Sequence, residues 1–270
     1  MKNGLRVIFG VVLLSGMMYG PVAIACSTDG WLGGVVSIPG NGVVDSPPSV
    51  SRYSGFCALE ITETSHVQSN YASDARYRAR FYVLDGLTGT GDVEMFTAYI
   101  EDAATNPLFN ISFDGTTFTF DASPANGGTA TVASENGWNL IEFDWDSVGG
   151  TLKYWVNADA SVDPETGSVD AGDGGTVEAV RLGALGGFGG QTGKLTYDAF
   201  ESHRLTSVGQ LLACDAEGDA ANNDVDINDA LATLDEVFAN PSILAQGQPD
   251  CDLNGSVNIN DALAILDLIF

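Results

Sequence analysis

Short runs in which apolar and polar residues alternate recur through most of the chain, from about residue 30 to 205. Successive side chains of a strand point to opposite faces, so such runs are typical of half-buried β-strands. Gly, Asn, Asp and Pro separate the runs, and no helical segments alternate with them, which favours an antiparallel sandwich over a parallel sheet. The predicted strands cover residues 77–83, 93–100, 108–113, 117–120, 140–145, 152–156, 177–182 and 195–200.

The pattern changes near the C-terminus, where the chain repeats itself. Cys214-Asp-Ala-Glu-Gly and Cys251-Asp-Leu-Asn-Gly are each followed by a near-copy of one segment, residues 224–238 and 256–270. Apolar residues recur at helical spacing in both segments, which predicts two amphipathic helices. The second is apolar around most of its circumference, so we expect it to need packing partners on several sides.

The N-terminus has the form of an export signal. Lys2 and Arg6 precede an apolar stretch, and Ala23-Ile-Ala25 fits a signal-peptidase site. The apolar stretch is shorter than a confident membrane span. We therefore predict a protein that is secreted by a bacterium or held at its surface. The predicted divisions are a signal peptide at 1–25, a β-sandwich at 26–205 and a small paired module at 206–270.

The chain is strongly acidic, with a formal net charge of −26. No Lys or Arg follows Arg204, so the C-terminal repeat has no positive charge of its own. Such a surface repels phosphate backbones, which argues against a nucleic-acid partner. It attracts cations, and calcium is the expected cofactor outside the cytoplasm.

The chain has four cysteines, an even number that favours disulfides in an exported protein. We expect Cys26 to pair with Cys57, and Cys214 with Cys251, which stand at equivalent positions when the repeats are aligned on Cys-Asp. Cys26 also directly follows the signal-peptidase site. The alternative is therefore that Cys26 carries a lipid, which makes the protein a membrane-anchored surface adhesin whose repeat serves as a calcium-stiffened cap.

The second half of the repeat has the spacing of an EF-hand calcium loop. Such a loop takes ligands from positions 1, 3, 5, 7, 9 and 12 and has Gly at position 6 for a sharp turn. Counted from Asp250, Gly255 falls at position 6. The predicted ligands are Asp250, Asp252, Asn254, the carbonyl of Ser256, Asn258 and Asp261.

The first half is less regular, because the stretch 219–223 lengthens it. Alignment on the two Cys-Asp pairs puts Ala213 opposite Asp250 and so removes one ligand. Several ligand assignments would work, and a structural loop without metal is the alternative. The candidate ligands are Asp215, Glu217, Asp219, Asp224, Asp226 and Asp229.

Residues 212–270 resemble a type I dockerin, in which each half is a calcium loop followed by a helix and position 12 is Asp. The resemblance implies calcium-dependent folding and docking to a cohesin domain of another protein. In dockerins the residues before position 12 help to select the cohesin. Here they are Ile227-Asn228 and Ile259-Asn260, identical in the two halves, which implies docking in two orientations.

The strands between about residues 50 and 205 are similar in order to a concanavalin A-like, or laminin G-like, jelly roll. The clearest segments are Asn136–Glu142, Gly150–Val156, Val180–Ala184 and Thr196–Arg204. Members of this fold commonly bind glycans or proteins, and a subset hydrolyses glycans. The resemblance therefore implies that the sandwich binds a polysaccharide or a surface component, although the fold alone does not choose an activity.

One predicted strand carries Glu142, Asp144 and Asp146 on one face. This resembles the catalytic strand of laminarinase-like glycosidases, in which two carboxylates act as nucleophile and acid. The alternative function is therefore a glycoside hydrolase that uses these three residues. Because Asp146 stands where the family has Glu, we favour a solvated strand face and a non-catalytic attachment protein.

Three arginines, Arg76, Arg78 and Arg80, also share one face of a predicted strand. We expect them to form cross-strand ion pairs with the carboxylate strand. The residues between the carboxylates, Ile141, Phe143 and Trp145, should then point into the core.

Overall fold

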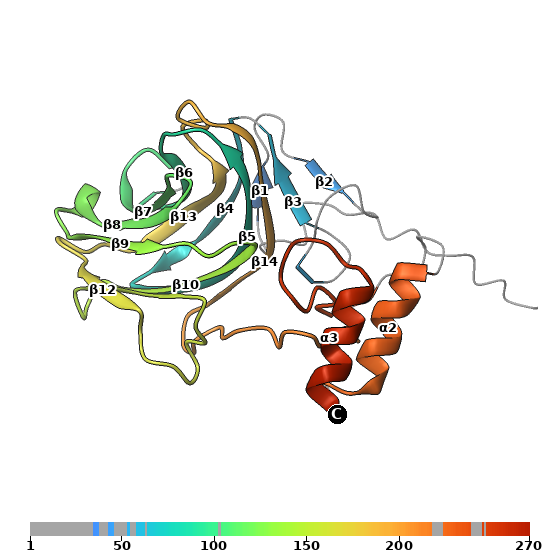
Figure 1. The fold of residues 1–270 in the computed structure, drawn as a ribbon. Coiled ribbons are helices and arrows are strands. Elements are labelled where there is room, and N and C mark those ends of the chain that lie inside the picture. Colours follow the sequence, from blue (N-terminus) through green and yellow to red (C-terminus); the bar gives the residue numbers. More distant parts are fainter. Residues whose placement is uncertain are drawn as a thin grey trace, which may run out of the picture.

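The computed structural model in Figure 1 describes the sandwich and most of the C-terminal module. The described residues are 53–54, 58–62, 64–101, 104–217, 224–238, 245 and 247–270, with the strand paths of 35–37 and 43–45. The predicted signal peptide, Cys26 and Cys57 lie outside them, and with these residues the Cys26–Cys57 pairing and the lipid alternative. Among the described residues, no helix is both long and apolar enough to cross a bilayer.

Two antiparallel sheets face each other, and each has seven strands (Figure 1). The first sheet runs, in spatial order, β1 Val35–Ser37, β4 Ser65–Asp74, β13 Val177–Ala184, β6 Val93–Tyr99, β7 Pro107–Phe113, β8 Thr117–Asp121 and β9 Thr129–Ala133. The second runs β12 Gly167–Asp170, β11 Thr151–Val156, β10 Trp138–Asp146, β5 Arg76–Thr88, β14 Thr192–His203, β3 Ala58–Ile61 and β2 Val43–Asp45. A 3₁₀ turn, η1 Ser123–Ala125, follows β8. The predicted antiparallel sandwich is thus confirmed.

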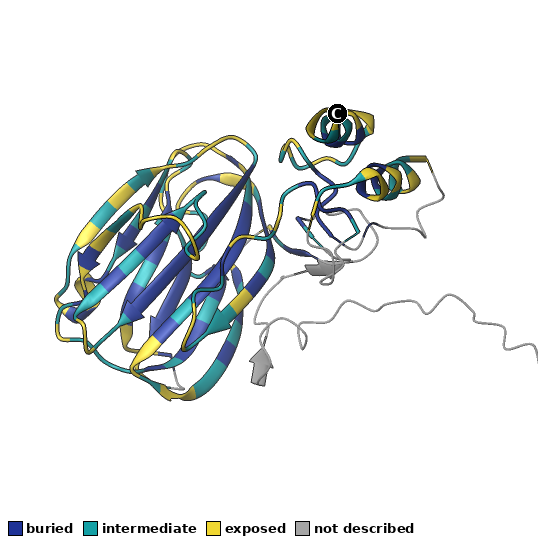
Figure 2. Ribbon diagram, turned by 90° about the horizontal axis from the view of Figure 1, so that it is seen from below, coloured by how far each residue is buried: buried dark blue, intermediate teal, exposed yellow. Residues whose placement is uncertain are grey.

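The core lies between the sheets and is rich in aromatic rings. Ile141, Phe143 and Trp145 of β10 are fully buried there, as predicted from their alternation. Phe143 meets Phe96 of the opposite sheet with ring centroids 4.8 Å apart, and Phe109 stacks on Trp145 at 5.1 Å. Figure 2 shows the buried residues as dark blue segments along the strands of both sheets. Ring burial of this extent supplies the main stabilisation of the sandwich.

The two predicted helices are α2 Ile227–Phe238 and α3 Ile259–Ile269. They pack on each other through Ala230 and Ile265, and a disulfide joins Cys214 to Cys251 beside them. Among the described residues α2 supplies one of the packing partners that α3 was expected to need: the buried residues of α3 are Asp261, Ala262 and Ile265, and apolar surface remains on its other sides. The outward sides of both helices are exposed (Figure 2).

The outer face of the second sheet is also buried where β10 and β5 lie side by side around Glu142. Glu142 and Asp144 of β10 are 1% and 5% exposed, and Arg80 of β5 is 4% exposed. The expectation of a solvated strand face is therefore wrong. The face is covered because the segment that leaves β14 turns back across it on the way to the C-terminal module.

Candidate functional site

The second loop of the repeat brings three of its predicted calcium ligands together. Asp250, Asp252 and Asp261 each offer a carboxylate oxygen to one cluster in which these atoms all lie within 4.8 Å of one another. Asp250 and Asp261 are fully buried, whereas Asp252 is exposed. The arrangement is a half-open group of hard oxygen donors, which is the donor type that calcium prefers.

Backbone amides hold the two buried carboxylates in place. Asp250 accepts hydrogen bonds from the amides of Asn254 and Gly255, at 3.1 and 2.7 Å. Asp261 accepts from the amides of Asp252 and Asn258, at 3.2 and 2.8 Å. Gly255 has a φ of +90°, a conformation that favours glycine and that turns the loop sharply. The loop thus positions its carboxylates through its own backbone.

The remaining predicted ligands are less directly engaged. The Asn258 side chain caps α3, accepting from the amide of Asn260 at 2.9 Å and donating to the carbonyl of Ser256 at 3.0 Å. Asn254 is exposed. These oxygens border the carboxylate cluster along the loop, so any role as calcium ligands remains a prediction.

Electrostatics make this cluster unfavourable without a cation. Burial raises the pKa of Asp250 to about 6, and the nearby charges of Asp261 and Asp252 act in the same direction. Burial also raises the pKa of Asp261. In the described part of the chain, no basic side chain forms an ion pair with any of the three. Buried carboxylates are normally paired or bound to metal, so the donor set fits a divalent cation.

The first loop has a different register from the one expected. Asp229, which is buried, accepts from the amides of Glu217 and Asp226 at 3.0 and 2.7 Å. The corresponding donors to Asp261 are the amides of Asp252 and Asn258. Glu217 therefore occupies the place of Asp252, and Asp215 that of Asp250, so the alignment that removed one ligand is wrong.

This register also separates the two cysteines. Cys214 directly precedes Asp215, whereas Cys251 directly follows Asp250. The two cysteines therefore do not stand at equivalent positions of the repeat, although they form the expected disulfide. Asp219 lies outside the described residues, and Asp224 is exposed. Among the described residues, the acidic side chains of the first loop do not form a cluster like that of the second.

The second loop is seated directly on the sandwich. The amide of Trp138, the first residue of β10, donates to the carbonyl of Leu253 at 2.9 Å. A side chain at Gly137 would place its Cβ 2.1 Å from that carbonyl, and one at Gly255 would lie 2.7 Å from a methyl group of Leu84. These close approaches need glycine on both sides of the contact.

The segment between the modules is fastened to the outer face of the second sheet. Glu142 accepts from the amides of Val208 and Gly209 at 2.8 and 2.9 Å. Arg80, directly opposite Glu142 in the sheet, donates to the carbonyl of Gly209 at 2.5 Å. Tyr82 then accepts from the amide of Leu211 at 2.9 Å. We call residues 206–213 the connector and this set of bonds the connector clamp.

The other two carboxylates of β10 also have partners. Arg76 donates to both oxygens of Asp144, at 3.0 and 2.6 Å, and Arg78 lies 3.0 Å from the same carboxylate. Asp146 accepts from the amides of Val148 and Gly149 at 3.1 and 2.7 Å. The predicted cross-strand ion pairs are therefore present for Arg76 and Arg78. Arg80 instead pairs with Glu201 at 3.0 Å, in addition to its bond in the clamp.

These contacts give structural roles to the three carboxylates that the hydrolase alternative requires. Burial raises the pKa of Glu142, while the two connector amides and Arg80 oppose the shift. A general acid needs access to a substrate, but both oxygens of Glu142 are occupied by the connector. The geometry thus favours a carboxylate that holds the connector over one that attacks a sugar.

The residues predicted to contact a cohesin lie on the surface of the module. Ile227 and Ile259 are 45% and 47% exposed, and Asn228 and Asn260 are exposed as well. Further exposed apolar side chains on the same helices and at the C-terminus are Leu231, Phe238, Leu263, Leu268 and Phe270. Single exposed apolar side chains are normal on a protein surface, but this many on two neighbouring helices indicate an interaction surface.

Comparisons with known proteins give a fold-level likeness only. No family model and no curated protein matches the chain. Among solved structures, the receptor-binding domain of botulinum neurotoxin type G has a TM-score of 0.45 at 10% identity, covering 67% of this chain and 45% of that one. A type C neurotoxin structure, described by its interaction with two ganglioside molecules, has a TM-score of 0.44 at 8% identity, covering 63% and 43%. The chain thus spans less than half the length of these structures.

We predict that Glu142→Gln loosens the connector. The amide keeps one acceptor oxygen but turns an NH₂ group towards a backbone N–H, which leaves one buried donor without a partner. The free energy of unfolding should fall by about 1–3 kcal/mol, measured by urea denaturation. Glu165→Gln is the control, because Glu165 is exposed and its ion pair, with Lys153 at 3.3 Å, lies on the surface. Unchanged stability of the Glu142 variant would show that the clamp is not structural.

Proposed function

We propose that this chain is an exported, non-catalytic attachment protein. Its C-terminal module binds calcium and docks as a dockerin to a cohesin domain of a partner, while its sandwich, of the concanavalin A-like type, binds carbohydrate. The observation that carries the metal part is the cluster of Asp250, Asp252 and Asp261, in which two carboxylates are fully buried and have no basic partner among the described residues. The loop spacing and its glycine turn support the same assignment.

The docking part of the proposal is supported by the exposed helix faces. Leu231 and Leu263 occupy corresponding positions of the two halves and are each 53% exposed. Together with Ile227 and Ile259 they form a repeated apolar surface that the described part of the chain leaves exposed. A structural cap would bury these side chains, whereas a docking module presents them.

Calcium binding is tested by calorimetric titration of the full chain. We expect binding, and a thermal stability that rises as calcium is added, by about 2.7 kcal/mol at a free calcium concentration of one hundred times Kd. Replacing both buried ligands, Asp250→Asn with Asp261→Asn, should abolish binding at the second loop. Asp267→Asn, on the exposed side of α3, is the control. No heat of binding and no stabilisation by calcium would contradict the metal assignment.

Docking is tested by passing the protein over a panel of immobilised bacterial cohesin domains, with calcium and with chelator. We expect calcium-dependent binding to at least one of them. Leu231→Asp with Leu263→Asp should weaken it about a hundredfold or more, since buried interface anchors dominate affinity. Val148→Asp, on an 88% exposed residue of the sandwich, should not. Binding that is unchanged both by chelator and by the helix substitutions would contradict the proposal that the module docks as a dockerin.

A further inference from the structure

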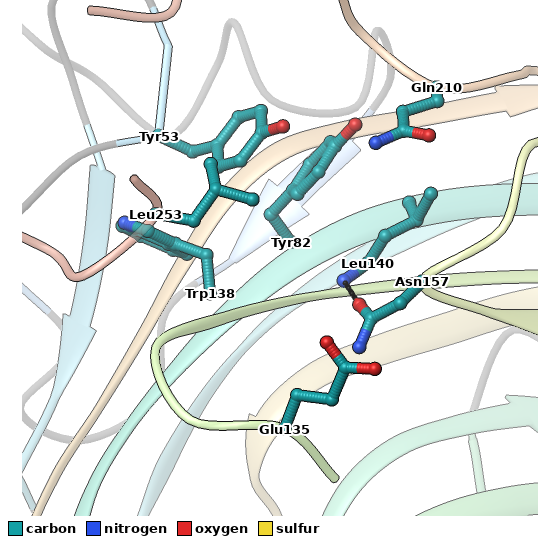
Figure 3. A pocket seen from close by; sticks show the side chains of 8 residues that line it. All are labelled: Tyr53, Tyr82, Glu135, Trp138, Leu140, Asn157, Gln210 and Leu253. Atoms are coloured by element: carbon teal, nitrogen blue, oxygen red, sulfur yellow. Dashed lines mark hydrogen bonds between the residues drawn. The ribbon is translucent and has the colours of Figure 1, made fainter. Parts of the chain in front are cut away.

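A groove follows the connector along the junction between the modules. Its inner part is a hollow of about 190 Å³, shown in Figure 3. Its outer part is a more open hollow of about 310 Å³ beside Asp159 and residues 210–213. Gln210 lines both hollows, so they are neighbours along the connector, and we call the two together the groove. The inner hollow exceeds the roughly 150 Å³ of a cavity known to hold benzene, so one six-membered ring fits there.

The inner hollow has an apolar wall built by both modules. Tyr53 stacks on Tyr82 with centroids 3.5 Å apart, and Trp138 meets Tyr53 edge-on at 5.7 Å. Leu253, from the second loop, packs against this cluster. Since Tyr53 and Tyr82 cover each other's faces, the wall is not an open aromatic cage of the kind that surrounds a cation.

Polar groups with spare bonding capacity lie opposite this wall. Figure 3 shows the carboxylate of Glu135 next to the amide of Asn157, and Gln210 further along the groove. Asn157 accepts from the amide of Leu140 at 2.8 Å and donates one N–H to Asn139, which leaves its second N–H. Within the described residues, the side chains of Glu135 and Gln210 make no hydrogen bond. The groove thus offers both donors and acceptors.

The charge of the groove further restricts the class of ligand that can bind there. Glu135 lines the inner hollow and Asp159 the outer one, and the described residues that line them include no Lys, Arg or His. An anionic ligand would meet these two carboxylates, and the positive charge of Arg80, which acts on Asp159, is already paired with Glu201 at 3.0 Å. An apolar wall with amide and carboxylate groups opposite it suits a ring that has apolar C–H faces and a rim of hydroxyls.

We propose that this groove binds a neutral oligosaccharide, with one sugar ring in the inner hollow against Trp138 and Leu253 and the chain continuing past Gln210. The inference rests on the carbohydrate-binding half of the proposed function and locates it at the junction. It also makes the second calcium loop part of the binding site, because Leu253 belongs to that loop.

The test is calorimetric titration of the calcium-loaded full chain with neutral tetrasaccharides: cellotetraose, laminaritetraose, xylotetraose and mannotetraose. We expect at least one to bind. Glu135→Ala with Gln210→Ala should weaken that binding at least about tenfold, because each side chain supplies a hydrogen bond to a hydroxyl. Both residues are exposed, so the variant should fold. Glu165→Ala is the control and should leave binding unchanged.

A tetramer of galacturonate and free choline serve as anionic and cationic probes, and neither should bind. Saccharide binding that is unaffected by the groove substitutions would overturn the groove assignment but leave carbohydrate binding by the sandwich intact. If no neutral tetrasaccharide binds, or if galacturonate or choline binds better, both the assignment of the groove and the proposal that the sandwich binds carbohydrate are overturned. The calcium titration is independent of both outcomes.

Discussion

The arrangement of the two modules depends on the backbone of one buried residue, Gly209. Glu142 accepts its N–H and Arg80 donates to its C=O, from adjacent strands of the same sheet. Burying a carboxylate and a guanidinium destabilises the folded state unless their hydrogen bonds are completed. The connector completes them, and in return its own buried amides are satisfied. Removing either the connector or the side chains of Glu142 and Arg80 would leave buried polar groups without partners.

Once the connector is fixed, the position of the C-terminal module is restricted. Only a few residues separate Gly209 from Cys214, whose disulfide with Cys251 ties the connector to the second loop. The same loop then meets Trp138 through the carbonyl of Leu253. The first part of the candidate metal loop is therefore held at two points, at Cys251 through the connector and at Leu253 by the sandwich directly. Its carboxylates, the aromatic cluster and the junction groove consequently form one connected region.

The sequence predicts those parts of this structure that depend on local pattern. Alternation identified the long core strands such as β10, and loop spacing identified the Asp250–Asp261 cluster. Strands with weak alternation were missed, among them β4, whose Ser and Asn positions resemble a loop, and the short β3, β9 and β12. Pattern carries no information on what covers the outside of a sheet. The partners of Glu142 are backbone amides about 66 residues away, which no residue type reveals. The alignment of the first loop was predicted wrongly for a similar reason. Asp229 accepts a hydrogen bond from the backbone amide of Glu217, and a backbone amide is present whatever side chain residue 217 carries.

The central claim is that the connector clamp and the seated loop make the two modules one rigid body. The most direct measurement is ¹⁵N relaxation of the full chain by NMR, which gives a rotational correlation time for each module separately. A clamped connector predicts the same correlation time for amides of the sandwich and of α2 and α3, with rigid order parameters through Val208–Leu211. A clearly shorter correlation time for the helices, with low order parameters in the connector, would contradict the account.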